Sequence, residues 1–229
     1  KRRTIEVKVT EESDIIVMAP KWVSQSEINQ FVESKSKWIQ QVKQRQAELR
    51  QPPYQFEPFD ELLYLNQVYR LNISEGETTD VYLKDRVIWL PRTVYERGHS
   101  ARKEALIRWY KDRAKEIILD RVRLISDQMG VTPNQVRIKT VQTKWGSCSS
   151  QKNLNFNWVL IGAPLAVIDY VVVHECAHLI HMNHSSKFWA VVAQFCPAYK
   201  GYIAWLKQNQ YALYRVQKSQ SHDYLDIMM

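Results

Sequence analysis

Four of the six histidines lie within residues 174–184, and this stretch constrains the chain more than any other feature. It contains the pattern His-Glu-x-x-His, formed by His174, Glu175 and His178. On a helix, residues four apart project from one face, so both imidazoles can bind one metal ion. Glu175 can then reach a water molecule in the remaining coordination position and accept its proton. The pattern predicts a helix that carries half of a hydrolytic metal site.

Catalytic zinc sites use three protein ligands and one open position, so a third ligand is needed. His181 and His184 are the candidates. Three ligands along one straight helix face are nearly collinear, which does not suit a tetrahedral ion, and this argues against His181. His184 suits the site if the chain turns after the helix, and Asn183 can supply that turn because asparagine tolerates the left-handed conformation. We therefore favour His184 and expect His181 to end the helix or to support a ligand.

The pattern also occurs by chance, and the alternative is an ordinary helix with core or surface histidines. Three observations favour the metal site. The preceding residues 171–173 are all valine, so the pattern lies in a strongly apolar helix. Burying the charged side chain of Glu175 in such a helix is costly unless it has a function. A third histidine also lies close by. We expect one Zn²⁺ per chain, with another divalent transition metal as an alternative.

Length and composition exclude several other classes of protein. The chain has 229 residues, 45% of them hydrophobic and 24% charged, which is typical of a globular protein of one or two domains. No apolar run approaches the ~20 residues of a membrane span. The six glycines are too far apart for a dinucleotide-binding or P-loop motif. The charged N-terminus is not a signal peptide, and three unpaired cysteines fit a reducing compartment, so we expect a cytoplasmic protein without a membrane partner.

The net charge of +8 fits an acidic partner, such as nucleic acid or nucleotide phosphates, or simply a solvated basic surface. The most basic segment is a predicted helix from Ser100 to Met129, with Gly130 as its stop. Acidic residues are interleaved with the basic ones in this segment, which favours a solvated helix face over a nucleic-acid-binding face. Nucleic acid stays a possible partner.

The remaining patterns predict an α+β protein. We expect an antiparallel β-rich unit with one helix at residues 1–98, a catalytic unit at 99–218 and a tail at 219–229. Alternation and turn residues predict strands at 4–9, 15–18, 62–73, 81–90, 136–141 and 154–160, with turns at 12–14, 72–76 and 84–86. Helical spacing predicts helices at 24–50, with a capping box of Ser24 and Glu27, and at 164–182, 185–195 and 198–216.

A polar loop is expected at 142–152, and it contains Lys144, Trp145, Gly146, Ser147 and Cys148. The glycine allows a ligand to approach the backbone closely, while the lysine and serine offer donors; a tight turn anchored by the tryptophan explains the residues equally well. Catalysis by Cys148 is improbable, because the nearby histidines are committed to metal. Cys176 lies within the histidine pattern but faces away from the metal, so we interpret it as core.

Together these segments resemble the YgjP-like family of zinc-dependent hydrolases, which belongs to the zincin-like metallopeptidases. The segments that carry the resemblance are 145–149, 154–158, 168–178, 183–185 and 188–189. The resemblance implies a zincin-like catalytic unit with His174, His178 and His184 as ligands and Glu175 as the catalytic carboxylate. Relatives include SprT-like proteases, and some relatives have instead been assigned pyrophosphatase activity on UTP.

We expect hydrolysis of a peptide bond, with Leu154–Trp158 as the sheet edge that holds an extended polypeptide. Two alternatives stay open: a nucleoside-triphosphate pyrophosphatase that uses the same metal, and a nucleic-acid-binding module with a structural metal. Candidate substrate-binding residues are Lys144, Trp145, Gly146, Ser147, Asn155, Asn157 and Tyr199. Tyr199 and Lys144 are weak candidates for stabilising an oxyanion.

The spacing of the histidines generates a first prediction. His184→Ala should strongly reduce metal occupancy because it removes one of three ligands, whereas His181→Ala should not. Elemental analysis of the purified wild-type protein should show about one equivalent of a transition metal. The reverse order of the two variants would identify His181 as the third ligand.

Overall fold

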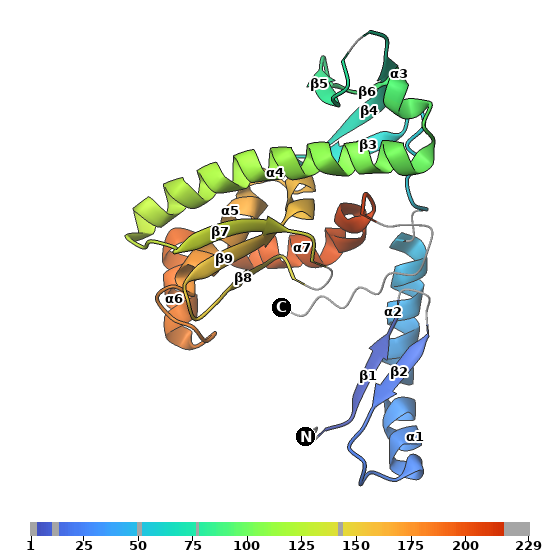
Figure 1. The fold of residues 1–229 in the computed structure, drawn as a ribbon. Coiled ribbons are helices and arrows are strands. Elements are labelled where there is room, and N and C mark those ends of the chain that lie inside the picture. Colours follow the sequence, from blue (N-terminus) through green and yellow to red (C-terminus); the bar gives the residue numbers. More distant parts are fainter. Residues whose placement is uncertain (1–3, 11–13, 50–51, 77, 142–143, 218–229) are drawn as a thin grey trace.

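The computed structural model describes residues 4–10, 14–49, 52–76, 78–141 and 144–217. An N-terminal arm, a four-stranded sheet and a helical unit around a three-stranded sheet follow one another, and a long helix joins the last two parts (Figure 1). Small sheets and long helices make this a mixed α+β fold, as predicted. The turn at 12–14 falls largely on residues outside this description, and the tail at 219–229 falls wholly outside it.

The arm comprises strands β1 (Glu6–Val9) and β2 (Ile15–Met18) and helices α1 (Gln25–Ser34) and α2 (Ser36–Leu49). The strands pair antiparallel, and the predicted capping box is present, because Ser24 and Glu27 each satisfy the other's backbone N–H. The prediction of one continuous helix was wrong, since it breaks at Lys35. Serines flank the break, and the Ser34 hydroxyl bonds the carbonyl of Phe31, a local bond that competes with the helical ladder.

The second unit is a sheet with strand order β3-β4-β6-β5. Its strands are β3 (Glu61–Tyr64), β4 (Gln67–Ser74), β5 (Tyr82–Lys84) and β6 (Val87–Pro91), and the short helix α3 (Arg92–Tyr95) follows. The predicted turn near residue 85 is present, but the sheet departs from the expected antiparallel pairing at one place, because β4 and β6 pair in parallel. The reason is that β5 lies at the outer edge and β6 returns between β5 and β4.

An unpredicted turn at Leu65 and Asn66 divides the expected strand 62–73 into β3 and β4. Both residues have positive φ, 48° and 59°, which is unfavourable for leucine. Their backbone N–H groups donate to the carbonyls of Ile161 and Gly162, each at 2.8 Å. The turn is therefore stabilised by contacts distant in sequence, which no local pattern reports.

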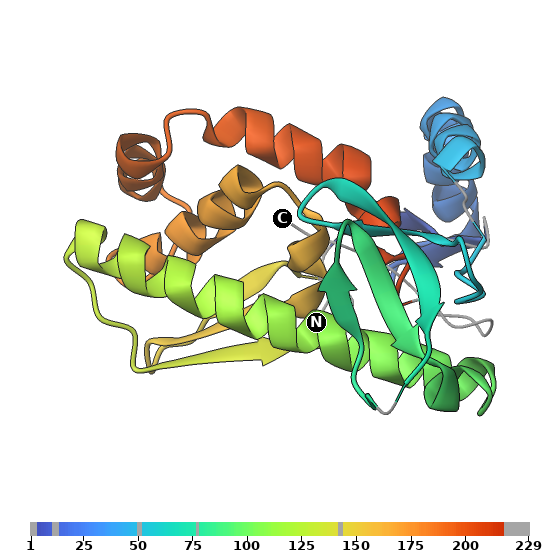
Figure 2. The ribbon, with the colours of Figure 1, turned by 90° about the horizontal axis from the view of Figure 1, so that it is seen from above.

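Helix α4 (His99–Met129) spans both the four-stranded sheet and the catalytic unit (Figures 1 and 2). Its N-cap is Gly98 rather than the predicted Ser100, and Gly130 ends it in the left-handed conformation as predicted. On its solvent side, pairs such as Glu104–Arg108 and Arg113–Glu116 show the interleaved charges interacting with each other. Its apolar side is fully buried, as Leu106, Ala114 and Ile118 illustrate.

The third unit contains a sheet with strand order β7-β9-β8, formed by β7 (Gln135–Lys139), β8 (Gly146–Cys148) and β9 (Asn153–Asn157). Two predictions were wrong here. The expected loop at 142–152 contains β8, and the strand expected at the sheet edge, β9, is central. β9 also ends at Asn157, after which the 3₁₀ helix η1 (Trp158–Gly162) follows.

Helices α5 (Leu165–Ala177), α6 (Ser186–Phe195) and α7 (Tyr199–Tyr214) complete this unit. α5 carries the histidine pattern and packs against α4, α6, α7 and β8. It ends at Ala177 instead of Met182, because the next backbone N–H groups form shorter-range turns, such as Leu179 to the carbonyl of Cys176. Among its described helices, the chain has none that is long and apolar enough to cross a membrane.

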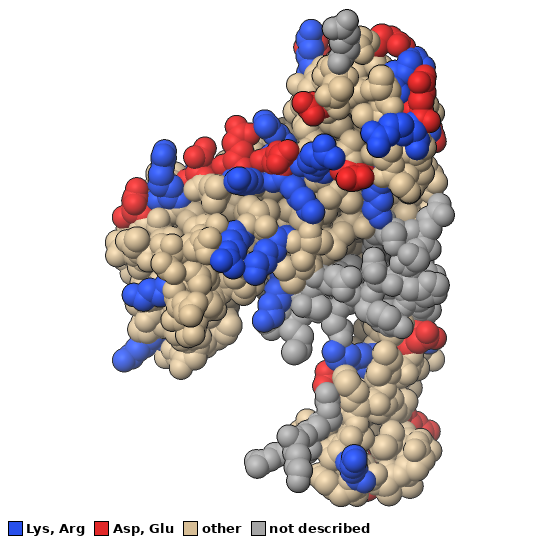
Figure 3. Space-filling view, viewed as in Figure 1, with Lys and Arg blue, Asp and Glu red and all other residues tan. Residues whose placement is uncertain are grey.

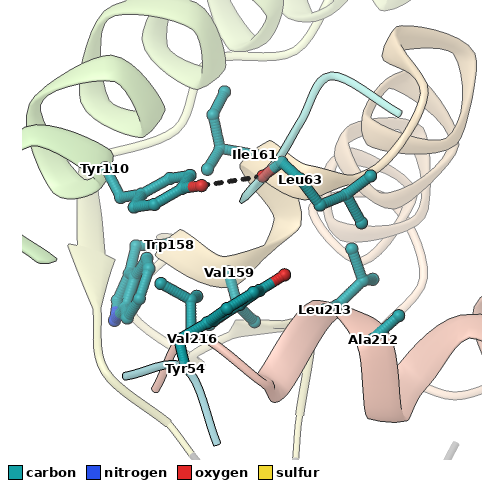
Figure 4. A pocket seen from close by; sticks show the side chains of 10 residues that line it. Tyr54, Leu63, Tyr110, Trp158, Val159, Ile161, Ala212, Leu213 and Val216 are labelled. Atoms are coloured by element: carbon teal, nitrogen blue, oxygen red, sulfur yellow. Dashed lines mark hydrogen bonds between the residues drawn. The ribbon is translucent and has the colours of Figure 1, made fainter. Parts of the chain in front are cut away.

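A small pocket lies where β3, α4, η1 and the end of α7 meet (Figure 4). Its lining is almost entirely apolar, and the Tyr110 hydroxyl in it donates to the carbonyl of Leu63 at 3.0 Å. Its lining contains no carboxylate, imidazole, thiol or amine, so nothing in it indicates a catalytic site.

Asn157 ties this part of the structure together and generates a second prediction. Its side chain is 0% exposed and its amide donates to the carbonyl of Val141 and the hydroxyl of Tyr214, at 2.6 and 2.8 Å. Asn157→Ala removes both of these donors from a buried site and leaves the Tyr214 hydroxyl and the Val141 carbonyl only their mutual bond of 3.3 Å, which should cost about 2 kcal/mol and several degrees of Tm. Thermal unfolding measures this. Asn134→Ala, at an exposed site with one hydrogen bond, is the matched control, and equal losses in both variants would contradict the structural role.

Candidate metal centre

The three predicted ligands converge on one point. His174 and His178 project from the end of α5, and His184 comes from the loop before α6. One nitrogen from each imidazole lies within 4.8 Å of the other two, and Nε2 of His184 lies 3.1 Å from Nε2 of His174. Tetrahedral zinc with Zn–N bonds of 2.0–2.1 Å needs ligand nitrogens roughly 3.3 Å apart. The cluster therefore fits a metal ion.

The electrostatics of the cluster also favour a cation. Burial, with the neighbouring His178 and His184, lowers the pKa of His174 to about 3, and burial lowers the pKa of His178 as well. Both imidazoles are thus neutral near pH 7, the form that binds metal. Two neutral ring nitrogens 3.1 Å apart either share an N–H···N hydrogen bond or hold a cation between them, and three such nitrogens together form a donor set that suits a positive ion.

His181 lies beyond the helix and contributes through its backbone. Its carbonyl lies 3.2 Å from Nδ1 of His178, so an Nδ1–H donates to it and Nε2 stays available to a metal. The turn after α5 was expected to use a left-handed Asn183, but Asn183 has no positive φ. The turn is made earlier, by the tightened backbone at residues 178–181.

Aromatic side chains that spacing arguments did not single out surround the ligands. The Phe188 ring is fully buried and lies 5.0, 4.5 and 4.8 Å from the rings of His174, His178 and His184. Trp189 lies 5.8 Å from His184 and stacks on Tyr199 at 5.2 Å. Their position directly after the third ligand, at the start of the next helix, is the signal that could have identified them.

Glu175 is 4% exposed, and Oε2 of its carboxyl has no hydrogen-bond partner among the described residues. Burial raises the pKa of Glu175 to about 8, and the charge of Lys144 acts in the opposite direction. A buried carboxyl without a partner is costly, so such a group indicates a functional role.

Strand β8 lies directly against this carboxyl. A Cβ atom on Gly146 would lie 2.6 Å from Oε1 and 2.7 Å from Cγ of Glu175, so only glycine leaves room for the carboxyl here. The sequence suggested that Gly146 admits a ligand to the backbone. The structure instead shows it admitting the side chain of Glu175.

The other predicted site residues divide into two groups. Lys144 is exposed next to β8, and Ser147 accepts a hydrogen bond from Asn155 at 3.2 Å on one face of the sheet. Trp145 and Asn157 are buried, because Trp145 packs on Tyr214 and Asn157 bonds backbone carbonyls and the Tyr214 hydroxyl.

Cys176 and Cys148, which the sequence did not predict to be catalytic, lie in environments that disfavour a reactive thiolate. Cys176 is fully buried in the core. Burial raises the pKa of the Cys148 thiol, and the nearby Glu175 raises it further. A raised pKa opposes formation of a thiolate nucleophile.

The sequence matches the family model described as "YgjP-like, metallopeptidase domain" over residues 3–209. The chain belongs to this family. Membership makes it a metal-dependent hydrolase of the metallopeptidase type and implies a divalent metal ion, for which the three histidines are a fitting site.

Two further comparisons were made. The crystal structure of the metallopeptidase zymogen abylysin from Pyrococcus abyssi aligns with 41% of this chain and 95% of its own chain, at 22% identity and a TM-score of 0.38. No curated protein matches the sequence.

The contact between Gly146 and Glu175 generates a third prediction. Gly146→Ala forces the carboxyl to move, so hydrolytic activity should fall by about tenfold or more, since catalysis requires sub-ångström placement. Metal content, measured by elemental analysis, should be unchanged. Gly201→Ala is the matched control, because a Cβ there contacts nothing within 4 Å. An active Gly146→Ala variant would show that the carboxyl tolerates displacement.

Proposed function

We propose that the chain is a zinc-dependent peptidase that cleaves extended polypeptide, with Glu175 as general base and acid. The observation that carries the proposal is a buried carboxyl, whose Oε2 has no hydrogen-bond partner among the described residues, on the helix that presents two of the three clustered histidines and against a short edge strand. This arrangement supports a metal, a base and a template for the substrate backbone within one small region.

His174, His178 and His184 would hold the zinc ion, leaving one position open. When bound, zinc supplies a Lewis acid for the scissile carbonyl and lowers the pKa of an attacking water. Glu175 accepts the proton of that water at Oε2, which has no hydrogen-bond partner in the part of the chain that the structure describes, and later delivers it to the leaving amine. Phe188 and Trp189 exclude bulk water from one side of the ligands.

The substrate template is β8, in place of the strand predicted from the sequence. Trp145 and Ser149 bond β9 at Asn157 and Asn153, both at 2.8–2.9 Å. In an antiparallel pair, residues whose backbone groups bond the partner strand alternate with residues whose backbone groups point away from it. Gly146 and Cys148 are of the second kind, so their N–H and C=O groups point away from β9. Among the described strands none pairs with that side of β8. These groups can hold an extended peptide beside Glu175.

The role of Glu175 generates a fourth prediction. Glu175→Gln keeps the shape but removes the base, so cleavage of an unfolded polypeptide should fall by at least about 10²-fold. Metal content should be nearly unchanged, as elemental analysis would show. Glu104→Gln, at an exposed position on α4, serves as the control.

A parallel assay with UTP separates the proposed activity from nucleotide hydrolysis. Release of pyrophosphate that depends on Glu175, together with intact polypeptide, would overturn the peptidase proposal. Loss of metal from Glu175→Gln would instead make Glu175 a ligand and contradict its assignment as base.

A further inference from the structure

Positive and negative side chains are distributed unevenly along the chain. Residues 1–127 contain 20 of the 24 Asp and Glu residues. Residues 128–222 contain only Asp169 and Glu175, against nine Lys and Arg residues. Neither carboxyl offers a negative surface, because Asp169 forms a two-bond ion pair with Arg121 at 2.6 and 2.9 Å and Glu175 is buried. The part of the chain that holds the metal centre is therefore almost purely cationic.

This asymmetry is visible on the molecular surface. Red and blue side chains alternate over α4 and the four-stranded sheet, whereas the face below α4, over β7, β9 and β8, shows blue and no red (Figure 3). The exposed cations on the three-stranded sheet and in the loops next to β8 are Arg137, Lys139, Lys144 and Lys152. Among the described residues, none of the four forms an ion pair.

The pairing of the strands places Lys144 and Lys152 near the two ends of β8, whereas Arg137 and Lys139 lie on β7, at the opposite edge of the same sheet. Lys144 comes two residues before β8, and Lys152 lies in the turn that follows it. Arg137 on β7 lies beside Asn155 on β9, and Asn155 lies beside Ser147 on β8. These three polar residues form a row across the sheet that ends at β8. A chain paired with β8 thus meets a lysine near each end and hydrogen-bond donors between them.

The sheet face does not resemble a platform for nucleic-acid bases. Such platforms stack bases on exposed aromatic rings. The exposed or half-exposed residues on the outer face of β7, β9 and β8 are Gln135, Arg137, Lys139, Asn153, Asn155 and Ser147. None is aromatic, so polypeptide is the polyanion that fits an edge strand best.

We propose that the polypeptide bound along β8 is acidic, with Asp or Glu side chains on both sides of the scissile bond facing Lys144 and Lys152. The inference rests on the proposed peptidase function and adds its substrate class. Arg137 and Lys139 extend the positive field and draw acidic chains toward the metal centre, whereas basic chains are repelled.

The test uses the zinc-loaded full chain and three peptides with one central sequence, flanked by Glu, Gln or Lys. The Glu-flanked peptide should give a kcat/KM at least about tenfold above the Gln-flanked one at low salt, with the difference mainly in KM and reduced by salt. The double variant Lys144→Glu and Lys152→Glu should reverse the preference toward the Lys-flanked peptide. Lys84→Glu, at an exposed position on β5 in the other sheet, should leave the preference for the Glu-flanked peptide unchanged.

Binding to the Glu175→Gln variant, followed by fluorescence anisotropy, separates substrate choice from catalysis. Equal cleavage of all three peptides would overturn the acidic-substrate inference and leave the peptidase function standing. Tight binding of the Glu-flanked peptide without cleavage by the wild type would support the inference about the surface and overturn the peptidase proposal. An oligonucleotide of equal charge that displaces the acidic peptide with higher affinity would overturn the inference and assign the surface to nucleic acid.

Discussion

The burial of α5 is the constraint on which the metal centre depends. Nine of its thirteen residues are buried, including Val171, Val172 and Val173, so the helix is held on all sides rather than along one stripe. Arg121 on α4 adds a two-bond ion pair to Asp169, which fixes the rotation of α5 about its axis. Because a rigid helix presents His174 and His178, the distance between the two rings is set by packing, before any ligand arrives.

The parts of the structure that the sequence predicted are those with local causes. The capping box at Ser24 and the glycine stop at Gly130 depend on residues within one turn, and both are present. The spacing of His174 and His178 likewise needs only helix geometry, and the cluster with His184 is assembled as expected. The functional roles of these histidines and of Glu175 stay predictions until metal and activity are measured.

The parts that the sequence did not predict depend on contacts between distant segments. Strand β8 is three residues long, and it is a strand only because β9 pairs with it; the turn at Leu65 is stabilised by the carbonyl of Ile161. The polar side chain of Asn157 suggested a role in binding a substrate, yet in the fold α7 packs over it and its amide donates to the Tyr214 hydroxyl. The clearance that Gly146 provides for Glu175 is equally invisible in sequence, because the two lie 29 positions apart.

The three ligands differ in their exposure: His178 is buried, His174 is intermediate and His184 is exposed. Two are thus built into the hydrophobic core, and the third stands at the surface on a loop. The fold does not need the ion as a nucleus, in contrast to small zinc domains that are unfolded without metal. We therefore expect metal loading to be a late step in maturation, in which a folded apoprotein binds the ion first through the two less exposed imidazoles and then through His184 from the solvent side. Exchange of one metal for another would then require movement of the loop that carries His184, while the core stays intact.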